Sequence, residues 1–467
     1  AYAVQKVRGE ELNRVKEVNM ITALAGKAAG VQVSKNSSGM GGSAKVSIRG
    51  VRSVAGDNQP LYVIDGVPML NSTSEQSYSA IGGTANAGNR DGGDGISNLN
   101  PEDVESISIL KGAPAAALYG SQAANGVILI TTKKGNTVGR RDIHFSTGLT
   151  FEKAFSLPEM QNSYGVSDVT DSWGEKENLT VYDNLGDFFR TGLTSITSVS
   201  VNSGNDKLQT YFSYANTTGR GILNENKLSK HNINLRETAV LFNSRLKLDG
   251  NVNVMKQTVK NKPVSGGFYM NPLVGLYRFP RGEDLSYYKE NYERYNEDRK
   301  LNTQNWHTVT EDFEQNPYWI QNRIQSKDAR IRLLLSLSAN LKVTDWLTLQ
   351  ARGNLDHSAD KLRQKFYAST ATALCGMNGR YIEMDYQETQ MYGDVMAMVK
   401  KQLNDFTLDV AIGGSINDRI TNSTRIDSKN ASLKYANVFN LANIVMSSSA
   451  SIDQKIDAHY QLQSVFA

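Results

Sequence analysis

Residues that could carry acid–base or metal chemistry are few and scattered in this chain. None of its five histidines has a second histidine or a cysteine at metal-ligand spacing, and no nucleophile-elbow motif supports a Ser-His-Asp triad. The histidines are His144, His231, His307, His357 and His459. His231 falls on the apolar side of a predicted strand, which favours an interface position over a catalytic one. We therefore predict no enzyme active site and no cofactor.

Two glycine-rich segments invite comparison with binding loops. Gly39-Met40-Gly41-Gly42 precedes a predicted strand instead of following one and opening a helix, so a tight turn is preferred over a nucleotide site. Asp91 and Asp94 lie on a glycine-rich loop, where two carboxylates could hold a hard cation. The loop lacks the oxygen spacing of a calcium site, and a polar turn is the preferred interpretation. The alternative, a cation bound by this pair, stays open.

Composition excludes several classes of protein. With 51 basic and 47 acidic residues, the net charge of +4 is nearly balanced, and nothing indicates a nucleic-acid partner. Cys375 is the single cysteine, so the chain forms no internal disulfide, and its small apolar neighbours predict an inert thiol. No run of about 18 apolar residues exists, which excludes a membrane-spanning helix. A soluble protein and a transmembrane β-barrel remain.

The first 138 residues predict a mixed α/β unit. Asn19 is a good N-cap for a helix that ends at Gly30, and Asn100-Pro101 is a second helix start. The segment 71–97, rich in Ser, Gly and Asn, is expected to be a surface loop. Short apolar runs predict the strands of a small sheet, at 46–49, 61–64, 106–110 and 127–132.

From about Arg140 the pattern changes to a period of two residues, which is typical of strands with one apolar and one polar face. In 331–341, for example, apolar residues at odd positions alternate with mostly polar residues that include Arg332. We predict about ten strands of about 8–14 residues, longer than is usual in globular proteins. They are 143–152, 195–203, 208–217, 231–236, 246–254, 331–341, 347–356, 389–402, 405–417 and 454–467.

The connections between these strands are unequal. Short polar turns, such as 203–207 and 342–345, join neighbouring strands, whereas other connections are long. Outer-membrane barrels have this asymmetry, with short periplasmic turns and long external loops. About ten strands are too few to close around a unit of some 130 residues, so we expect the first portion of a barrel of about 22 strands. The long connections are 153–194, 259–328, 359–388 and 418–453.

Three sequence blocks carry a family resemblance: Val46–Gly50, Pro60–Pro68 and Glu102–Gly135. In order and spacing they resemble the plug of a TonB-dependent outer-membrane transporter. The sequence LYGSQAANGVILITTKKG, which begins at Leu118, resembles the SusC/RagA branch of Bacteroidetes. The likeness covers residues 1 to about 138 closely and the rest by pattern. Its motif positions are Arg49, Gly50, Asp65, Gly66, Pro68, Lys111, Gly112, Leu118, Tyr119, Gly120, Asn125 and Gly126.

The resemblance implies an α+β plug domain (1–138) inside a transmembrane antiparallel β-barrel (139–467) in the bacterial outer membrane. It implies active import powered by TonB, which pulls on a short box expected upstream of Ala1. A SusD-like surface lipoprotein is expected to cover the extracellular loops. The implied cargo is a glycan-derived oligosaccharide or, as in the RagA variant, an oligopeptide, and glycans are favoured. A siderophore or cobalamin importer and a signal-transducing receptor are the nearer alternatives.

Polar residues on the inward strand faces are expected to contact the plug and line the permeation path. The set is Lys247, Asp249, Asn251, Arg332, Arg352, Asn354 and Asp356. Aromatic residues near strand ends are expected to form a girdle at the lipid headgroups. That set is Phe151, Phe155, Phe188, Phe189, Tyr211, Phe212, Tyr214, Trp346 and Phe406. The aromatic residues of the 259–328 connection either stack on sugar rings or pack against the lid.

Two rival classes differ from this interpretation. In a soluble adhesin or carbohydrate-binding β-protein, the apolar strand faces would form the core of a sandwich instead of meeting lipid. A glycan-cleaving enzyme would need two carboxylates about 5–9.5 Å apart in a cleft, and no motif indicates such a pair.

Overall fold

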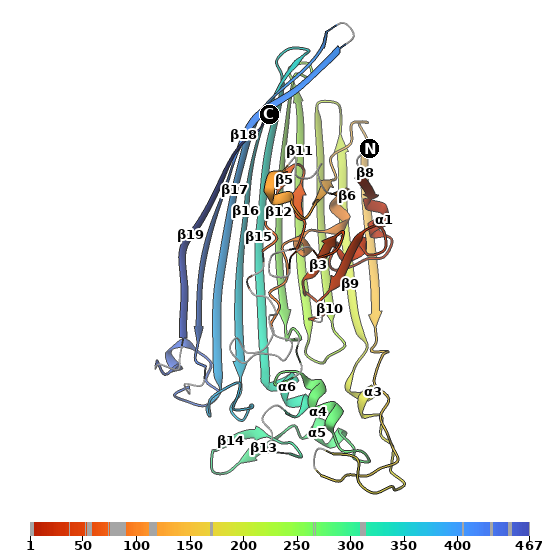
Figure 1. Cartoon of the computed structure of the whole chain (residues 1–467), viewed down its shortest axis with the longest axis vertical. Coiled ribbons are helices and arrows are strands. Elements are labelled where there is room, and N and C mark those ends of the chain that lie inside the picture. Colours follow the sequence, from red (N-terminus) through yellow and green to blue (C-terminus); the bar gives the residue numbers. More distant parts are fainter. Residues whose placement is uncertain are drawn as a thin grey trace.

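The structure is a computed structural model with two parts, a small N-terminal unit and a long sheet (Figure 1). The predicted boundary at residue 138 falls in the connection between them. The described residues are 4–36, 38–51, 53, 58–72, 74, 90–111, 119–168, 171–264, 266, 268–308, 314–403, 406–429, 433–446 and 451–466.

The N-terminal unit contains a five-stranded sheet in the order β1-β6-β7-β4-β5 and a separate hairpin of β2 and β3. β4 and β7 are parallel, and the other pairs are antiparallel. The predicted strands are confirmed as β3, β4, β6 and β7. The bounds are β1 Val4–Arg8, β2 Val31–Lys35, β3 Ala44–Ile48, β4 Leu61–Ile64, β5 Val67–Pro68, β6 Val104–Leu110 and β7 Val127–Thr132.

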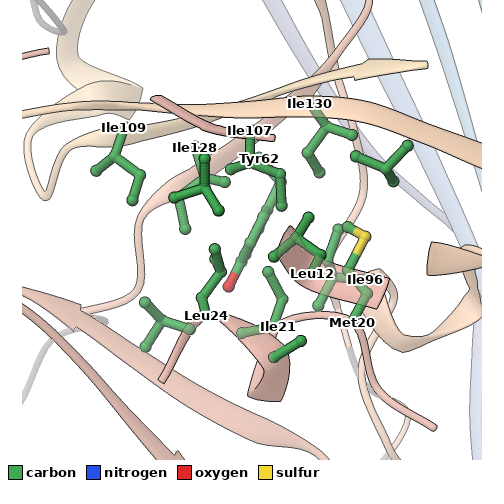
Figure 2. Packing of buried hydrophobic residues seen from close by; sticks show 14 of the residues in the cluster. Leu12, Met20, Ile21, Leu24, Tyr62, Ile96, Ile107, Ile109, Ile128 and Ile130 are labelled. Carbon is green, nitrogen blue, oxygen red and sulfur yellow. The ribbon is translucent and has the colours of Figure 1, made fainter. Parts of the chain in front are cut away.

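The core of this unit forms where apolar residues of the sheet meet short helical segments (Figure 2). Ile107 and Ile109 of β6 lie beside Ile128 and Ile130 of β7, and Tyr62 of β4 extends among them. All of these side chains are buried. The helical segments are α1 Gly9–Asn13, η1 Thr22–Leu24, η2 Ile96–Asn98, η3 Pro101–Asp103 and η4 Gly120–Ala123.

Both helix predictions are wrong in extent. The segment 19–30 forms only the turn η1, since Gly26 and Gly30 adopt positive φ angles of 73° and 67° that end a right-handed helix. At the second site Asn100 does cap, because its side chain accepts a hydrogen bond from the Glu102 N–H. The helix nevertheless stops after η3, where the chain enters β6.

The long sheet contains ten antiparallel strands in chain order, each at a predicted place. Only their lengths were underestimated: β17 has 24 residues, because paired backbone continues well beyond the alternating apolar segments. The bounds are β8 Arg141–Glu152, β9 Gly192–Gly204, β10 Leu208–Arg220, β11 Lys227–Leu241, β12 Leu246–Lys260, β15 Ile324–Lys342, β16 Leu347–Phe366, β17 Arg380–Leu403, β18 Phe406–Asp427 and β19 Ser451–Phe466.

Short turns and long connections lie at opposite ends of the sheet (Figure 1). The predicted connection 359–388 is too long, since β16 reaches Phe366 and β17 begins at Arg380. Likewise β18 continues to Asp427. The connections between β12 and β15 and between β8 and β9 carry elements of their own. These are α3 Asn184–Phe188, α4 Pro272–Arg278, α5 Ser286–Glu290, β13 Glu293–Asn296, β14 Leu301–Gln304 and α6 Pro317–Arg323, with η5 Leu441–Asn443 after β18.

One face of the sheet carries rows of exposed apolar side chains, and the other face meets the N-terminal unit. Phe145, Leu337 and Val395 are exposed by 66%, 63% and 63%. Arg332, next to one of these rows on β15, is buried at 3%. Of the helices in the described part of the chain, none is both long and apolar enough to cross a membrane.

The predicted aromatic set divides between the two faces. Phe151, Phe155, Phe212, Trp346 and Phe406 are exposed. Tyr214 is half-buried and its hydroxyl lies 2.9 Å from Nδ1 of His231, an exposed residue on the same outer face.

The prediction of an exposed girdle position is wrong for Tyr211 and Phe188, which are buried. Tyr211 has the opposite parity to Phe212 on β10 and therefore faces the N-terminal unit. Phe188 packs edge-to-face on Tyr318 and Phe189 within the long connections.

The long connections form cores of their own. Trp306 and Tyr318 are buried with Phe279, and the indole N–H of Trp319 donates to the Thr370 hydroxyl at 3.0 Å. Tyr287 and Tyr295 are exposed. Cys375 is buried in a neighbouring cluster, and burial raises the pKa of its thiol to about 12. The thiolate is therefore scarce at neutral pH, as the predicted inert thiol requires.

Candidate functional site

The contact between the N-terminal unit and the sheet is built on arginines that project from β11, β15 and β16, with β12 lying between β11 and β15. Each arginine pairs with an aspartate of the adjacent strand, either directly opposite or diagonally across the ladder. All four carboxylates are at most 9% exposed. The pairs are Arg236–Asp249 (2.9 Å), Arg330–Asp360 (2.5 Å), Arg332–Asp356 (2.5 Å) and Arg352–Asp394 (2.9 Å).

The remaining N–H groups of these guanidiniums point at the N-terminal unit and donate to its backbone carbonyls. Arg332 reaches two separate segments of the unit, near residues 70 and 95. These bonds are charge-assisted, yet the acceptors are neutral. They run from Arg236 to Thr132 O (3.2 Å), from Arg330 to Asp94 O (3.1 Å), from Arg332 to Gly95 O (2.6 Å) and Leu70 O (2.7 Å), and from Arg352 to Gly66 O (3.0 Å).

This division of roles has an electrostatic consequence. Each arginine keeps its counter-charge on its own sheet, so moving the N-terminal unit away breaks hydrogen bonds but leaves these four charge pairs intact. A buried charge without a partner would cost far more than a lost bond to a carbonyl. The sheet can therefore hold the unit firmly through many contacts of modest individual strength.

Among the described residues three ion pairs cross the contact, one of them between Lys134 and Asp249 at 3.6 Å. Asp65 of the N-terminal unit accepts from Arg236 at 2.9 Å, and Arg90 pairs with Asp328 of β15. Asp65 and Gly66 form the two-residue turn between β4 and β5, with φ angles of 49° and 89° that such a turn needs. The turn is fixed because Asp65 also accepts from the backbone N–H (3.0 Å) and hydroxyl (2.6 Å) of Thr132.

Lysine and asparagine side chains of the sheet extend the same pattern towards the long connections. Lys230 donates to Ser97 O at 2.6 Å, and Asn232 donates to Asn98 O at 2.7 Å. Lys262, just beyond β12, donates to Gly41 O and Asp91 O, both at 2.9 Å. Burial lowers the pKa of Lys262 to about 7, and Arg90 nearby acts in the same direction.

One acidic group of the N-terminal unit receives hydroxyl donors from the sheet. Tyr211 and Ser213 of β10 donate to the carboxylate of Asp103 at 3.0 Å and 2.5 Å. Burial raises the pKa of Asp103, and these hydrogen bonds oppose the shift. The phenol of Tyr211 therefore serves as a hydrogen-bond donor to the unit.

Asp91 and Asp94 lie in a buried loop, so the prediction of a surface loop over 71–97 is wrong for its described residues from 90 onward. The Asp91 carboxylate accepts from the N–H groups of Ser43 (2.6 Å) and Gly93 (2.8 Å). Asp94 accepts from Ala44 (2.7 Å) and Ser97 (2.9 Å) in the same way. Backbone N–H groups, whose dipoles point their positive ends at the oxygens, thus already balance the negative charge of both carboxylates. Within the described ranges no three His, Cys, Asp or Glu side chains gather as a metal site would need.

The other motif positions lie in turns around the sheet of the N-terminal unit. Arg49 and Gly50 have positive φ angles after β3, and the Arg49 N–H donates to Gly30 O at 2.9 Å. Lys111 donates to Ala29 O after β6. Pro68 ends β5, Asn125 and Gly126 precede β7, and Gly120 opens η4. Tyr119 is half-buried beside a cavity of about 540 Å³ that Arg352 also lines. Gly112 and Leu118 fall outside the described residues.

The structure joins some of the predicted inward residues directly to the N-terminal unit. Asp249, Arg332, Arg352 and Asp356 belong to the arginine–aspartate pairs. Asn251 and Asn354 line a small cavity beside the unit, while Lys247 is exposed and lines the cavity of about 540 Å³. The sequence interpretation missed several members: Arg236, Arg330, Asp360, Asp394, Lys230 and Lys262. The alternation of faces along each strand, by odd and even positions, would have placed all of these residues except Lys262 on the inward face.

Comparison with known proteins gives the family. Residues 1–127 match the model of the TonB-dependent Receptor Plug Domain. The TonB-dependent receptor SusC of Bacteroides thetaiotaomicron is 31% identical over 279 residues, which cover 57% of this chain and 25% of SusC. TonB-dependent receptor P26 of Formosa agariphila is 34% identical over 160 residues, covering 34% of this chain and 14% of the relative.

Solved structures share the fold of the whole chain. The RagAB peptide importer in its closed-closed state superposes with a TM-score of 0.72 at 20% identity, covering 99% of this chain and 52% of that chain. The ferric citrate transporter FecA gives a TM-score of 0.54 at 11% identity and covers 52% of its own chain.

The chain spans about a quarter of the length of SusC and about half of the matched RagAB chain. The N-terminal unit matches the plug model, and the ten strands match part of the barrel in the solved RagAB fold. The family consists of transporters of the bacterial outer membrane and not of enzymes. This chain is a plug domain followed by barrel strands of a TonB-dependent receptor of the SusC/RagA type.

Proposed function

We propose that this chain belongs to a TonB-dependent importer that carries a bulky oligomer across the bacterial outer membrane. The observation that supports this most strongly is the way the barrel holds the plug. Barrel arginines keep their aspartate partners on neighbouring strands and donate to plug carbonyls, so a pulling force can remove those contacts one at a time. Each such bond contributes about 0.5–1.5 kcal/mol net, or somewhat more for a charged donor.

Two partners belong to this proposal. TonB supplies the force, acting on a segment expected upstream of the plug. A SusD-like surface lipoprotein covers the long connections, and the similarity to the RagAB complex supports a lid of this kind. The exposed Tyr287 and Tyr295 lie in the connection between β12 and β15 and are available for such a contact.

The cargo has two candidates. The SusC-like sequence motif of the plug favours a glycan-derived oligosaccharide as the cargo. The fold shared with a peptide importer over 99% of this chain supports an oligopeptide as the second candidate.

Deletion of the gene tests import. We expect the deletion strain to lose growth on one class of polymer, either a glycan or protein-derived peptides, because no other route admits the oligomer at the same rate. Growth is measured on a panel of single polymeric carbon sources, with the complemented strain and growth on the corresponding monomer as controls. Unchanged growth on every glycan and peptide source would contradict the proposal.

A further inference from the structure

A cavity of about 420 Å³ lies where the plug meets the long connections of the barrel. The plug contributes the turn at Gly39 and Met40, and the barrel contributes the loops after β10 and β12 together with α6 and the start of β15. Figure 1 shows α4 and α6 beyond the N-terminal unit, at the end of the sheet that carries the long connections. The volume is within the range of small-ligand sites, about 300–1,000 Å³.

The apolar part of the cavity wall is mainly aliphatic, and polar residues such as Arg90, Lys262 and Asn271 complete the wall. Among its described lining residues Phe189 contributes the one aromatic ring. A surface for stacking sugar rings is therefore small here, whereas an apolar side chain would find contacts on several sides. The aliphatic members include Met40, Leu223, Met270, Leu273, Ile320 and Ile324.

Two buried carboxamides in the wall have unused hydrogen-bonding groups. Gln321 of α6 is 6% exposed, and neither its side-chain oxygen nor its nitrogen has a partner among the described residues. Gln364 of β16 is 1% exposed, and its side-chain oxygen likewise has no partner in the part of the chain that the structure describes. Buried polar atoms are nearly always satisfied, so these groups call for water or a ligand in the cavity. Together they offer at least one donor and two acceptors.

A secondary amide carries the complementary pair, one N–H and one C=O, and in a peptide it lies beside a side chain that is often apolar. We propose that this cavity binds an apolar, amide-bearing segment of the cargo, as found in an oligopeptide. The proposal rests on the import function above and selects the second of its two cargo candidates. Because the plug and the barrel loops both line the cavity, a bound segment would touch both at once.

The test uses the whole transporter with its lid, purified in detergent, and the Q321L/Q364L variant. Leucine has a volume close to that of glutamine, and replacing unpartnered buried amides with apolar groups is nearly neutral for folding. The probe is a terminally blocked Ala-Leu-Ala-Leu-Ala peptide, and its binding is measured by calorimetry. We expect about a tenfold loss of affinity, which corresponds to the loss of one or two hydrogen bonds. Gln325→Leu is the matched control, because Gln325 lies outside the cavity wall and is expected to leave binding unchanged.

Three outcomes would overturn the assignment. The wild-type protein could fail to bind the peptide, or the double variant could bind it as tightly as the wild type. Chitopentaose could bind more tightly than the peptide and lose affinity in the double variant. The cavity would then recognise the amide of an N-acetylated sugar instead of a peptide bond. Growth of the deletion strain keeps the two proposals apart. If deletion abolishes growth on a glycan while the peptide does not bind, the proposal of import is supported and the assignment of this cavity to a peptide segment is contradicted.

Discussion

Replacing Arg332 with leucine is expected to destabilise the folded transporter by about 3–5 kcal/mol, because Asp356 then stays buried without a counter-charge. The same substitution removes the donors to Leu70 O and Gly95 O, which loosens the plug in the barrel. Urea unfolding of the purified protein measures the stability, and hydrogen exchange of the plug segment around Gly95 measures the loosening.

Two further variants separate the charge effect from general damage. The double variant R332L/D356L should lose less stability than R332L alone, since no charge is left unpaired. Lys361→Ala breaks an exposed pair with Asp385, which joins the same two strands, β16 and β17, as the buried Arg352–Asp394 pair; the side chains of Lys361 and Asp385 are 69% and 44% exposed. Its effect should be at most about 1 kcal/mol. Equal losses in the single and double variants would show that the aspartate does not need its arginine.

Gly126→Ala is expected to have the second large effect, a loss of about 2–5 kcal/mol in plug stability. Two costs add: the left-handed backbone conformation, about 1–2 kcal/mol, and overpacking of the core, about 1–3 kcal/mol. Gly126 has a φ of 94°, and a Cβ there would lie 2.9 Å from Ile48 Cδ1 and 3.0 Å from Leu110 O. Resistance of the plug to a protease in the intact transporter, measured over a urea series, reports the loss.

Gly120 provides the matched control for this variant. Its φ of 62° is also left-handed, but a Cβ there meets no described atom within 4 Å. Gly120→Ala should therefore cost only the conformational term, about 1–2 kcal/mol. If both variants lost the same stability, crowding between β7 and its neighbours would not be the reason for a glycine at this position.

The sequence predicted the strands well and their contacts only in part. Alternation of apolar and polar residues needs no tertiary information, which is why all ten barrel strands and the inward parity of Arg332, Arg352 and Asp356 could be predicted. The partner of each arginine depends on the strand register. Asp356, for instance, lies diagonally from Arg332, whose direct neighbour is Ser358. Lys262 lies outside the segments in which apolar and polar residues alternate, so this alternation could not identify it as a residue that contacts the plug.

Composition misled the prediction wherever polar residues are buried by tertiary structure. The loop around Asp91 and Asp94 is polar in sequence, yet barrel donors and plug N–H groups satisfy its carbonyls and carboxylates and so permit its burial. Tyr211 was assigned to the lipid face for its type, although its parity is that of the lumen. The buried positions of Gln321 and Gln364 depend on how the long connections fold against the plug and the barrel, which a local sequence pattern does not give.

The exposed apolar rows of the sheet are expected to meet lipid while the opposite face holds the plug. Spin labels placed one at a time at residues 335 to 339 of β15, in the transporter reconstituted into a bilayer, test it most directly. We predict high accessibility to oxygen at Leu335, Leu337 and Ala339, and protection from it at Ser336 and Ser338. Equal accessibility along the strand, or odd positions shielded from oxygen by a second layer of protein, would contradict the account.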